Sequence, residues 1–235
     1  LNFLVSESTK YDPTIIYISN SNDSKIFIEA LEGTWLEIDK QIINPFLVDD
    51  TEKSQAFILE FLKMLSGHYI SPLNEVELTF LEKLRSKILS IDKEKRIFSD
   101  ILKLEDFKEE GGSTILDKLK GFTEGQLYSG LFDQSVFNIN ESSIFGLNLY
   151  KLSDEPFSKQ FYPSERKYLE QFNNNLKKHQ SVCASVVYTL TYHLSLVGTK
   201  PKIFAADSFD KLYKPEIYSD NISLIFNNLS ENNGV

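Results

Sequence analysis

The sequence has 235 residues, of which 41% are hydrophobic and 25% are charged, and its formal net charge is −9. This composition is typical of a globular protein with a hydrophobic core, and the acidic balance argues against a broad nucleic-acid-binding surface. No stretch interleaves basic and aromatic residues, so there is no direct nucleic-acid signature. The single cysteine, Cys183, cannot form an internal disulfide, which fits a reducing compartment. The three histidines lack the spacing of metal ligands.

The sequence contains no recognisable targeting or membrane segment. It begins at Leu1 without a Met or a basic stretch, and we therefore interpret it as part of a longer protein. The longest apolar stretch, residues 182–197, is interrupted by serine and threonine residues. It is too short and too polar to span a bilayer, so we expect a buried helix there.

The first 50 residues alternate between helix and strand signals. In order, they predict the end of a helix (1–8), a buried β-branched strand (14–19), a second helix, and a short strand (34–38). We expect Asp23 or Ser24 to cap the second helix and Gly33 to end it. This alternation is typical of a parallel α/β domain.

From residue 51 onward the pattern predicts helices alone. Thr51 is placed to cap the first of them, and two more are predicted over about 75–88 and 93–104. We interpret the charges in this region, such as Glu82-Lys83 and residues 92–96, as a solvated face. The sequence therefore predicts an α/β core of residues 1–50 and 112–235, interrupted by an all-helical insertion of residues 51–111.

The remaining elements return to the α/β pattern. They are a short helix (114–120), a buried strand (143–149), a long helix (164–196) with a break allowed near 178–180, a strand (203–206) and a final helix from Pro215. The second half of the long helix is apolar enough to lie against the sheet. Cys183 lies in that half, and we expect it to be a core residue because no basic group is spaced to activate it.

Asp207 directly follows the last predicted strand, which a Gly-Thr-Lys-Pro turn precedes. Sites in parallel α/β sheets lie just beyond the carboxyl ends of the strands. In phosphate-loop nucleoside triphosphatases an aspartate at such a position holds Mg²⁺. Many α/β proteins, however, use an acidic residue there only as a helix cap or a solubilising turn. The sequence itself contains no Gly-rich phosphate loop.

Several motifs, taken in their order along the chain, are similar to one family. They are Leu1-Asn-Phe-Leu-Val5, Lys25-Ile-Phe-Ile-Glu-Ala-Leu-Glu-Gly33, Asn44-Pro-Phe46, Leu131-Phe-Asp133, Phe145-Gly-Leu-Asn148 and the stretch from Ile203 to Leu212. Together they resemble the conjugative-transfer ATPases of type IV secretion systems, the VirB-four/TraC class. The resemblance implies a RecA-like phosphate-loop NTPase fold, that is, a parallel sheet flanked by helices. It also implies a phosphate loop just before Leu1, and ATP with Mg²⁺ that Asp207 binds through water.

The sequence departs from this family at the positions that support hydrolysis. Ser208 replaces the catalytic glutamate that activates the attacking water, and Ser19-Asn-Ser-Asn22 replaces a charged loop. The last helix, which carries arginines in the family, reads Asn227-Asn-Leu-Ser-Glu-Asn-Asn233. Loss of an arginine finger alone lowers turnover by about 10³–10⁵. The resemblance therefore implies a degenerate member with little or no hydrolysis.

Three hypotheses follow. In the first, the chain belongs to a ring subunit, or to a companion of an active paralogue. It would assemble with other type IV secretion subunits as a homo- or hetero-oligomer, in the cytoplasm and peripheral to the inner membrane. In the second, it is a working ATPase in which Asp210 or Asp23 positions the water. In the third, it is an unrelated α/β binding module. A structure without parallel strands at 14–19 and 203–206, adjacent or one strand apart, would favour the third.

Overall fold

The computed structural model describes residues 1–19, 21–36, 43–69, 71–103, 112–123, 128, 130–133, 143–148, 166–196 and 200–207. The chain divides into two compact units. One contains residues 1–40 and 138–235, and the other contains residues 41–137. Ser208, Asp210 and the predicted final helix lie outside the described residues.

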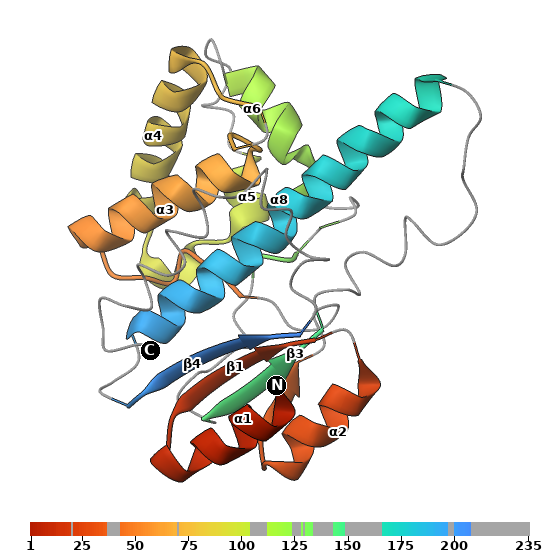
Figure 1. The fold of residues 1–235 in the computed structure, drawn as a ribbon. Coiled ribbons are helices and arrows are strands. Elements are labelled where there is room, and N and C mark those ends of the chain that lie inside the picture. The colour runs from red at the N-terminus through yellow and green to blue at the C-terminus, as the bar shows by residue number, and fades with distance from the viewer. Residues whose placement is uncertain are drawn as a thin grey trace. The chain divides into compact units, whose positions relative to one another are not determined.

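The first unit is built around a parallel four-stranded sheet of order β2-β3-β1-β4 (Figure 1). Its elements are α1 (Asn2–Ser8), a 3₁₀ turn (Thr9–Tyr11), β1 (Thr14–Ile18), α2 (Asn22–Ala30), β2 (Thr34–Leu36), β3 (Ile144–Leu147), α8 (Arg166–Leu196) and β4 (Lys202–Ala206). Strands β1 and β4 are adjacent and parallel, with Ile18 opposite Ala206. This pairing confirms the predicted parallel α/β core.

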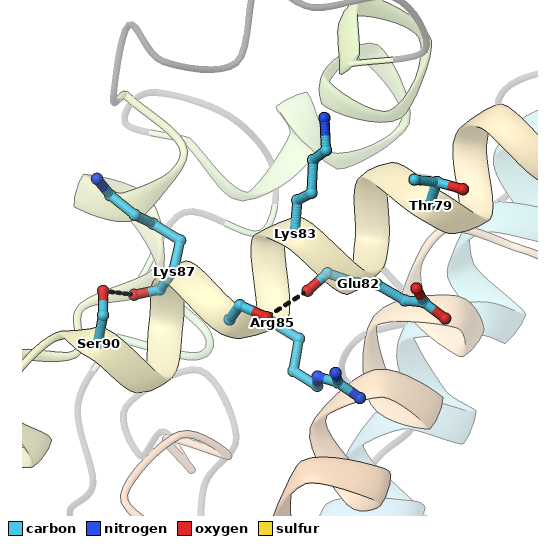
Figure 2. Close-up of a pocket in the computed structure, with 7 residues that line it drawn as sticks. Thr79, Glu82, Lys83, Arg85, Lys87 and Ser90 are labelled. Carbon is cyan, nitrogen blue, oxygen red and sulfur yellow. Dashed lines mark hydrogen bonds between the residues drawn. The ribbon is translucent and has the colours of Figure 1, made fainter.

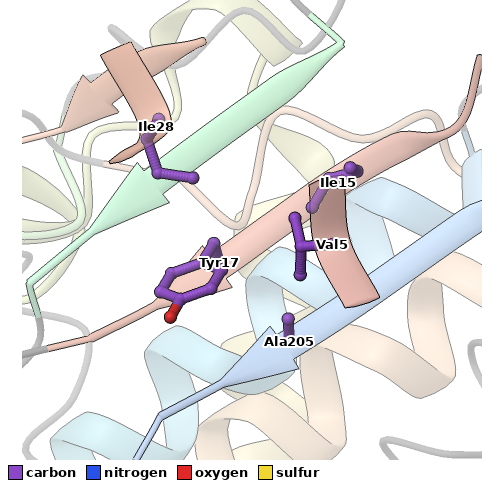
Figure 3. Packing of buried hydrophobic residues seen from close by; sticks show 5 residues of the cluster. All are labelled: Val5, Ile15, Tyr17, Ile28 and Ala205. Carbon is purple, nitrogen blue, oxygen red and sulfur yellow. The ribbon is translucent and has the colours of Figure 1, made fainter. Parts of the chain in front are cut away.

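Helices cover both faces of the sheet, which explains why the strands are apolar throughout. Helices α1 and α2 lie on one face and α8 lies on the other (Figure 1). All five residues of β1 are buried. On the α1–α2 face the core contains Val5, Ile15, Tyr17, Ile28 and Ala205, which come from α1, β1, α2 and β4 (Figure 3).

Gly146 in β3 leaves room for close packing on this face. A β-carbon added there would lie 2.5 Å from the Trp35 ring and 2.8 Å from the Ile28 side chain. Trp35 is the register partner of Gly146 on β2. The Phe-Gly-Leu-Asn motif therefore has a packing reason, because only glycine lets the ring lie against the strand.

Helix α8 is continuous for 31 residues, so the break that the sequence allowed near residues 178–180 does not occur. Its second half is buried, as predicted, and includes Val182, Val186 and Leu190. The buried hydroxyls there hydrogen-bond to carbonyls of the preceding turn, as Thr189 does to Ser185. Among the described residues, no helix has the length and apolar character that crossing a membrane requires.

The second unit, residues 41–137, is helical in its described parts. It contains α3 (Glu52–Leu65), α4 (Glu75–Ser90), a 3₁₀ turn (Lys93–Lys95), α5 (Phe98–Ile101), α6 (Gly112–Leu119) and a second 3₁₀ turn (Lys120–Phe122). Thr51 caps α3 as predicted, because its hydroxyl accepts a hydrogen bond from the amide of Ser54. The unit is longer than the predicted insertion of residues 51–111, whose limits stay a prediction.

One of the charged residues interpreted as solvated, Arg96, is buried instead. Glu82 and Lys83 are exposed on α4, as expected, but Arg96 is only 5% exposed. Its guanidinium donates to the carbonyls of Phe46 and Val48 at 3.0 and 2.8 Å. Arg96 therefore turns inward with a non-helical backbone, which is why the helix predicted over 93–104 is split into a 3₁₀ turn and α5.

The ends of α2 also differ from the prediction. The cap is Ser21, whose hydroxyl accepts from the amide of Asp23, so neither Asp23 nor Ser24 caps the helix. At the other end it is Glu32, and not Gly33, that adopts the left-handed conformation (φ 59°). Gly33 is needed for space instead, since an added β-carbon would lie 2.8 Å from Ile144.

Candidate functional site

Backbone hydrogen bonds join the carboxyl ends of three parallel strands, β4, β1 and β3. We call this end of the sheet its carboxyl edge. The amide of Asp207 donates to the carbonyl of Ile18 at 2.8 Å, and the amide of Ser19 donates to the carbonyl of Leu147 at 3.0 Å. These bonds extend the β4–β1 and β1–β3 pairings by one residue beyond the strands. Asp207 thus lies, half-buried, at the edge where the sequence placed it.

A chain of hydroxyl groups occupies the same edge beside Asp207. Ser19 is fully buried, and its Oγ lies 2.8 Å from the Oγ of Ser24. The Ser19 Oγ also accepts a hydrogen bond from the amide of Ser21, which in turn caps α2. These serines therefore fulfil the turn and capping roles of the loop without adding negative charge.

Tyr17 extends this polar cluster to the start of α1. Its ring is buried and lies 5.9 Å from that of Phe27, and its hydroxyl donates to Oδ1 of Asn2 at 2.6 Å. Burial raises the pKa of the Tyr17 hydroxyl above its ordinary value of 10.0; hydrogen bonding by Ser24 lowers this pKa, and the charge of Asp207 raises it. Tyr17 is therefore a neutral hydrogen-bond donor at physiological pH.

The described residues bring together some, but not all, of the site residues named from the sequence. Asp207 lies at the edge, whereas Asp23, the proposed alternative base, is exposed in the first turn of α2. Ser208 and Asp210 lie outside the described residues. Sequence reasoning missed Tyr17 and Ser24. The alternation along β1 could have placed Tyr17 on the face of Ile15, but its partner Asn2 depends on the tertiary fold.

The carboxylate of Asp207 at this edge fits a Mg²⁺ ion whose other ligands are nucleotide phosphates and water. Mg²⁺ is usually held by one or two carboxylates together with substrate phosphates and water. Asp207 provides one such carboxylate, and its amide bonds to the carbonyl of Ile18, the residue before Ser19. Among the residues that the structure describes, no group of three or more His, Cys, Asp or Glu side chains could hold a metal ion by itself.

A shallow groove on the second unit, shown in Figure 2, is a weaker candidate. It runs along one helix, α4, and is lined by Thr79, Glu82, Lys83, Arg85, Ser86, Lys87 and Ser90. Its hydroxyls bond to carbonyls of their own helix, as Ser90 does to Lys87 and Ser86 does to Glu82. The groove is therefore best described as the solvated face of α4.

Comparison with known proteins supports the fold and does not extend to activity. No protein-family model and no curated protein sequence matched the chain. Among solved structures, it is similar to VirB4 of Thermoanaerobacter pseudethanolicus, with a TM-score of 0.68 and 15% sequence identity. The similarity covers 99% of this chain but 63% of that one, so the chain spans less than two thirds of its length. The chain thus has an α/β, RecA-like fold.

Proposed function

We propose that this chain is the ATPase-like domain of a type IV secretion component, with a nucleotide site at the carboxyl edge of its sheet. The observation that carries the proposal is Asp207, half-buried at the end of β4 and hydrogen-bonded to the end of the adjacent strand β1. The similarity in fold to VirB4 and the order of the sequence motifs support it. Fold similarity alone does not determine function, so the site carries the argument.

In this proposal Asp207 holds Mg²⁺ through water, and a phosphate loop before Leu1 binds the phosphates of ATP. Mg²⁺ bound there would neutralise part of the phosphate charge. Asp207 supplies the negative charge, and Ser19, Ser24 and Tyr17 keep the edge polar without competing for the cation.

We further propose that hydrolysis is weak or absent. Ser208 cannot act as a carboxylate base, and the 227–233 stretch contains no arginine. The serines at 19 and 21 form neutral caps in the described loop, where the family resemblance implies charged residues. The chain would then serve as a ring subunit or as a companion to an active paralogue. It would work among other secretion subunits, at the cytoplasmic face of the inner membrane.

An active hydrolase is the second candidate. It requires another carboxylate to position the water, and Asp23 is the described carboxylate that directly follows the loop of residues 19–22. Its exposed place in the first turn of α2 is also that of a residue that stabilises the helix dipole. If Asp23→Asn lowered turnover strongly while ATP affinity stayed constant, this second candidate would be supported over the first.

Binding of ATP to the full-length protein, measured by calorimetry with and without Mg²⁺, tests the proposal. Asp207→Asn should weaken binding in the presence of Mg²⁺ by about tenfold or more and have less effect without it. Asp12→Asn is the matched control, because Asp12 is exposed, pairs with Lys200 at 2.7 Å, and precedes the opposite end of β1. Equal effects of the two substitutions would contradict a specific role for Asp207.

A further inference from the structure

We infer that Tyr17 is a positioning residue of this site, which fastens the first turn of α1 to the carboxyl edge of the sheet through Asn2. The link of Tyr17 to ATP binding rests on the proposed function, in which α1 would follow directly after the phosphate loop. Its geometry, however, stands by itself in the first unit.

Tyr17 links segments that are distant in the sequence. Its hydroxyl donates to Asn2, fifteen residues earlier, at 2.6 Å, and it also interacts with Ser24 on α2. Ser24 lies 2.8 Å from Ser19, the residue that follows β1 and bonds to the end of β3. One phenol group therefore connects α1, β1 and α2 at the edge that carries Asp207.

Packing alone does not account for this arrangement. The Tyr17 ring is 1% exposed among Val5, Ile28 and Ala205, where phenylalanine would fill almost the same volume (Figure 3). A hydroxyl buried in such surroundings is unfavourable unless it has partners. Here the hydroxyl donates to Oδ1 of Asn2 on α1 at 2.6 Å. The hydroxyl therefore ties α1 to β1 one turn before the core contact that Val5 makes.

This arrangement has a consequence for ligand binding. A ligand that binds in front of α1 must find the first turn already in place, or its binding must supply the free energy for ordering that turn. Tyr17 keeps the turn ordered before binding. Removal of its hydroxyl should therefore loosen α1 and weaken ATP binding, while the core that surrounds the ring is retained.

The test compares Tyr17→Phe, Asn2→Ala and the double variant in the full-length protein. Amide hydrogen exchange without ligand reports on α1, and calorimetry reports the affinity for ATP with Mg²⁺. We expect faster exchange in residues 3–8 and an affinity about threefold to tenfold lower in each single variant, the usual effect of losing one neutral hydrogen bond. The double variant should be no worse than either, since both remove the same bond. Tyr11→Phe, at an exposed tyrosine, is the control.

Several results would overturn the inference. Unchanged exchange in α1 for Tyr17→Phe, or additive effects of the two substitutions, would show that the bond does not hold the helix end. Faster exchange with unchanged ATP affinity would show that the held turn does not serve the site. Absence of ATP binding by the unaltered protein would instead overturn the proposed function, while the exchange data still decide whether Tyr17 holds α1.

Discussion

The side-chain amide of Asn44 donates a 2.7 Å hydrogen bond to the backbone carbonyl of Arg96, 52 residues further along the chain. The same amide group donates to the carbonyl of Asp133 at 3.3 Å, and Oδ1 of Asp133 accepts from the amide of Ser99 at 2.8 Å. Two of the sequence motifs, Asn44-Pro-Phe46 and Leu131-Phe-Asp133, thus meet inside the second unit. Their role in the described structure is to hold its loops together.

Arg96 is central to this arrangement, and its replacement by lysine should destabilise the protein. The guanidinium donates to carbonyls of Phe46, Val48, Leu89 and Ile91. Lysine cannot reach all of them, and each buried carbonyl left without a partner costs about 1–3 kcal/mol. We expect urea unfolding to show a loss of about 2 kcal/mol or more. Lys95→Gln, at the exposed neighbour, should change stability by less than about 0.5 kcal/mol. Similar losses in both variants would contradict this account.

Gly146→Ala should destabilise the first unit through overpacking. The added methyl group would meet the Trp35 ring at 2.5 Å, and strain of this kind costs about 1–3 kcal/mol. Trp35 is the only tryptophan in the sequence, so its fluorescence reports directly on the strained contact. A second substitution, Trp35→Leu, should restore part of the lost stability by making room. A Gly146→Ala variant with unaltered emission and stability would show that the ring does not lie against β3.

His68 should make the second unit sensitive to acid. Burial lowers the pKa of His68 below its ordinary value of 6.5; Lys63 and Lys118 lower it as well, against the opposing charge of Glu60. The neutral imidazole is therefore favoured in the folded state, where Nδ1 accepts a hydrogen bond from the amide of Leu73 at 3.0 Å. Because the unfolded chain takes up the proton more readily, stability should fall as the pH drops below 6.5 and level off below the folded-state pKa.

The matched variant for this prediction is His68→Asn. The Asn side-chain oxygen can accept the same hydrogen bond from Leu73 but does not titrate in this range. Thermal unfolding followed between pH 7.5 and about pH 5 should therefore lose part of its pH dependence in the variant. An identical pH profile for the two proteins would show that another group is responsible.

Cys183 should be unreactive in the native protein. Burial in α8 raises the pKa of its thiol to about 12, so almost none of the reactive thiolate is present at pH 8. Because it is the single cysteine, a thiol reagent reports on one site. We expect labelling to be slow in buffer and fast in denaturant. Rapid stoichiometric labelling under native conditions would mean that this part of α8 opens readily.

The elements whose pattern is local could be predicted from the sequence. The β-branched run of β1, the apolar half of α8 and the Thr51 cap all follow from periodicity and residue type. The position of Asp207 could also be predicted, because it depends only on where one strand ends. The parallel pairing of β1 with β4 agrees with the expected sheet.

The features that sequence reasoning missed depend on contacts between distant segments. Arg96 was interpreted as part of a solvated face, yet it is only 5% exposed, because backbone carbonyls accept hydrogen bonds from its guanidinium. The partners of Tyr17 likewise lie on α1 and α2, and no periodic pattern indicates them. Charge and polarity were reliable guides to exposure only where no buried carbonyl or hydroxyl was within reach.

Hydrolysis by the full-length protein, measured on the sample used for ATP binding, distinguishes weak turnover from ordinary turnover. We expect that ATP with Mg²⁺ binds, that Asp207→Asn weakens this binding, and that phosphate release stays near the background rate. Turnover at a rate ordinary for an ATPase, abolished by Asp207→Ala, would contradict weak hydrolysis and direct the search to the carboxylate that replaces Ser208. Absence of ATP binding would contradict the nucleotide site itself.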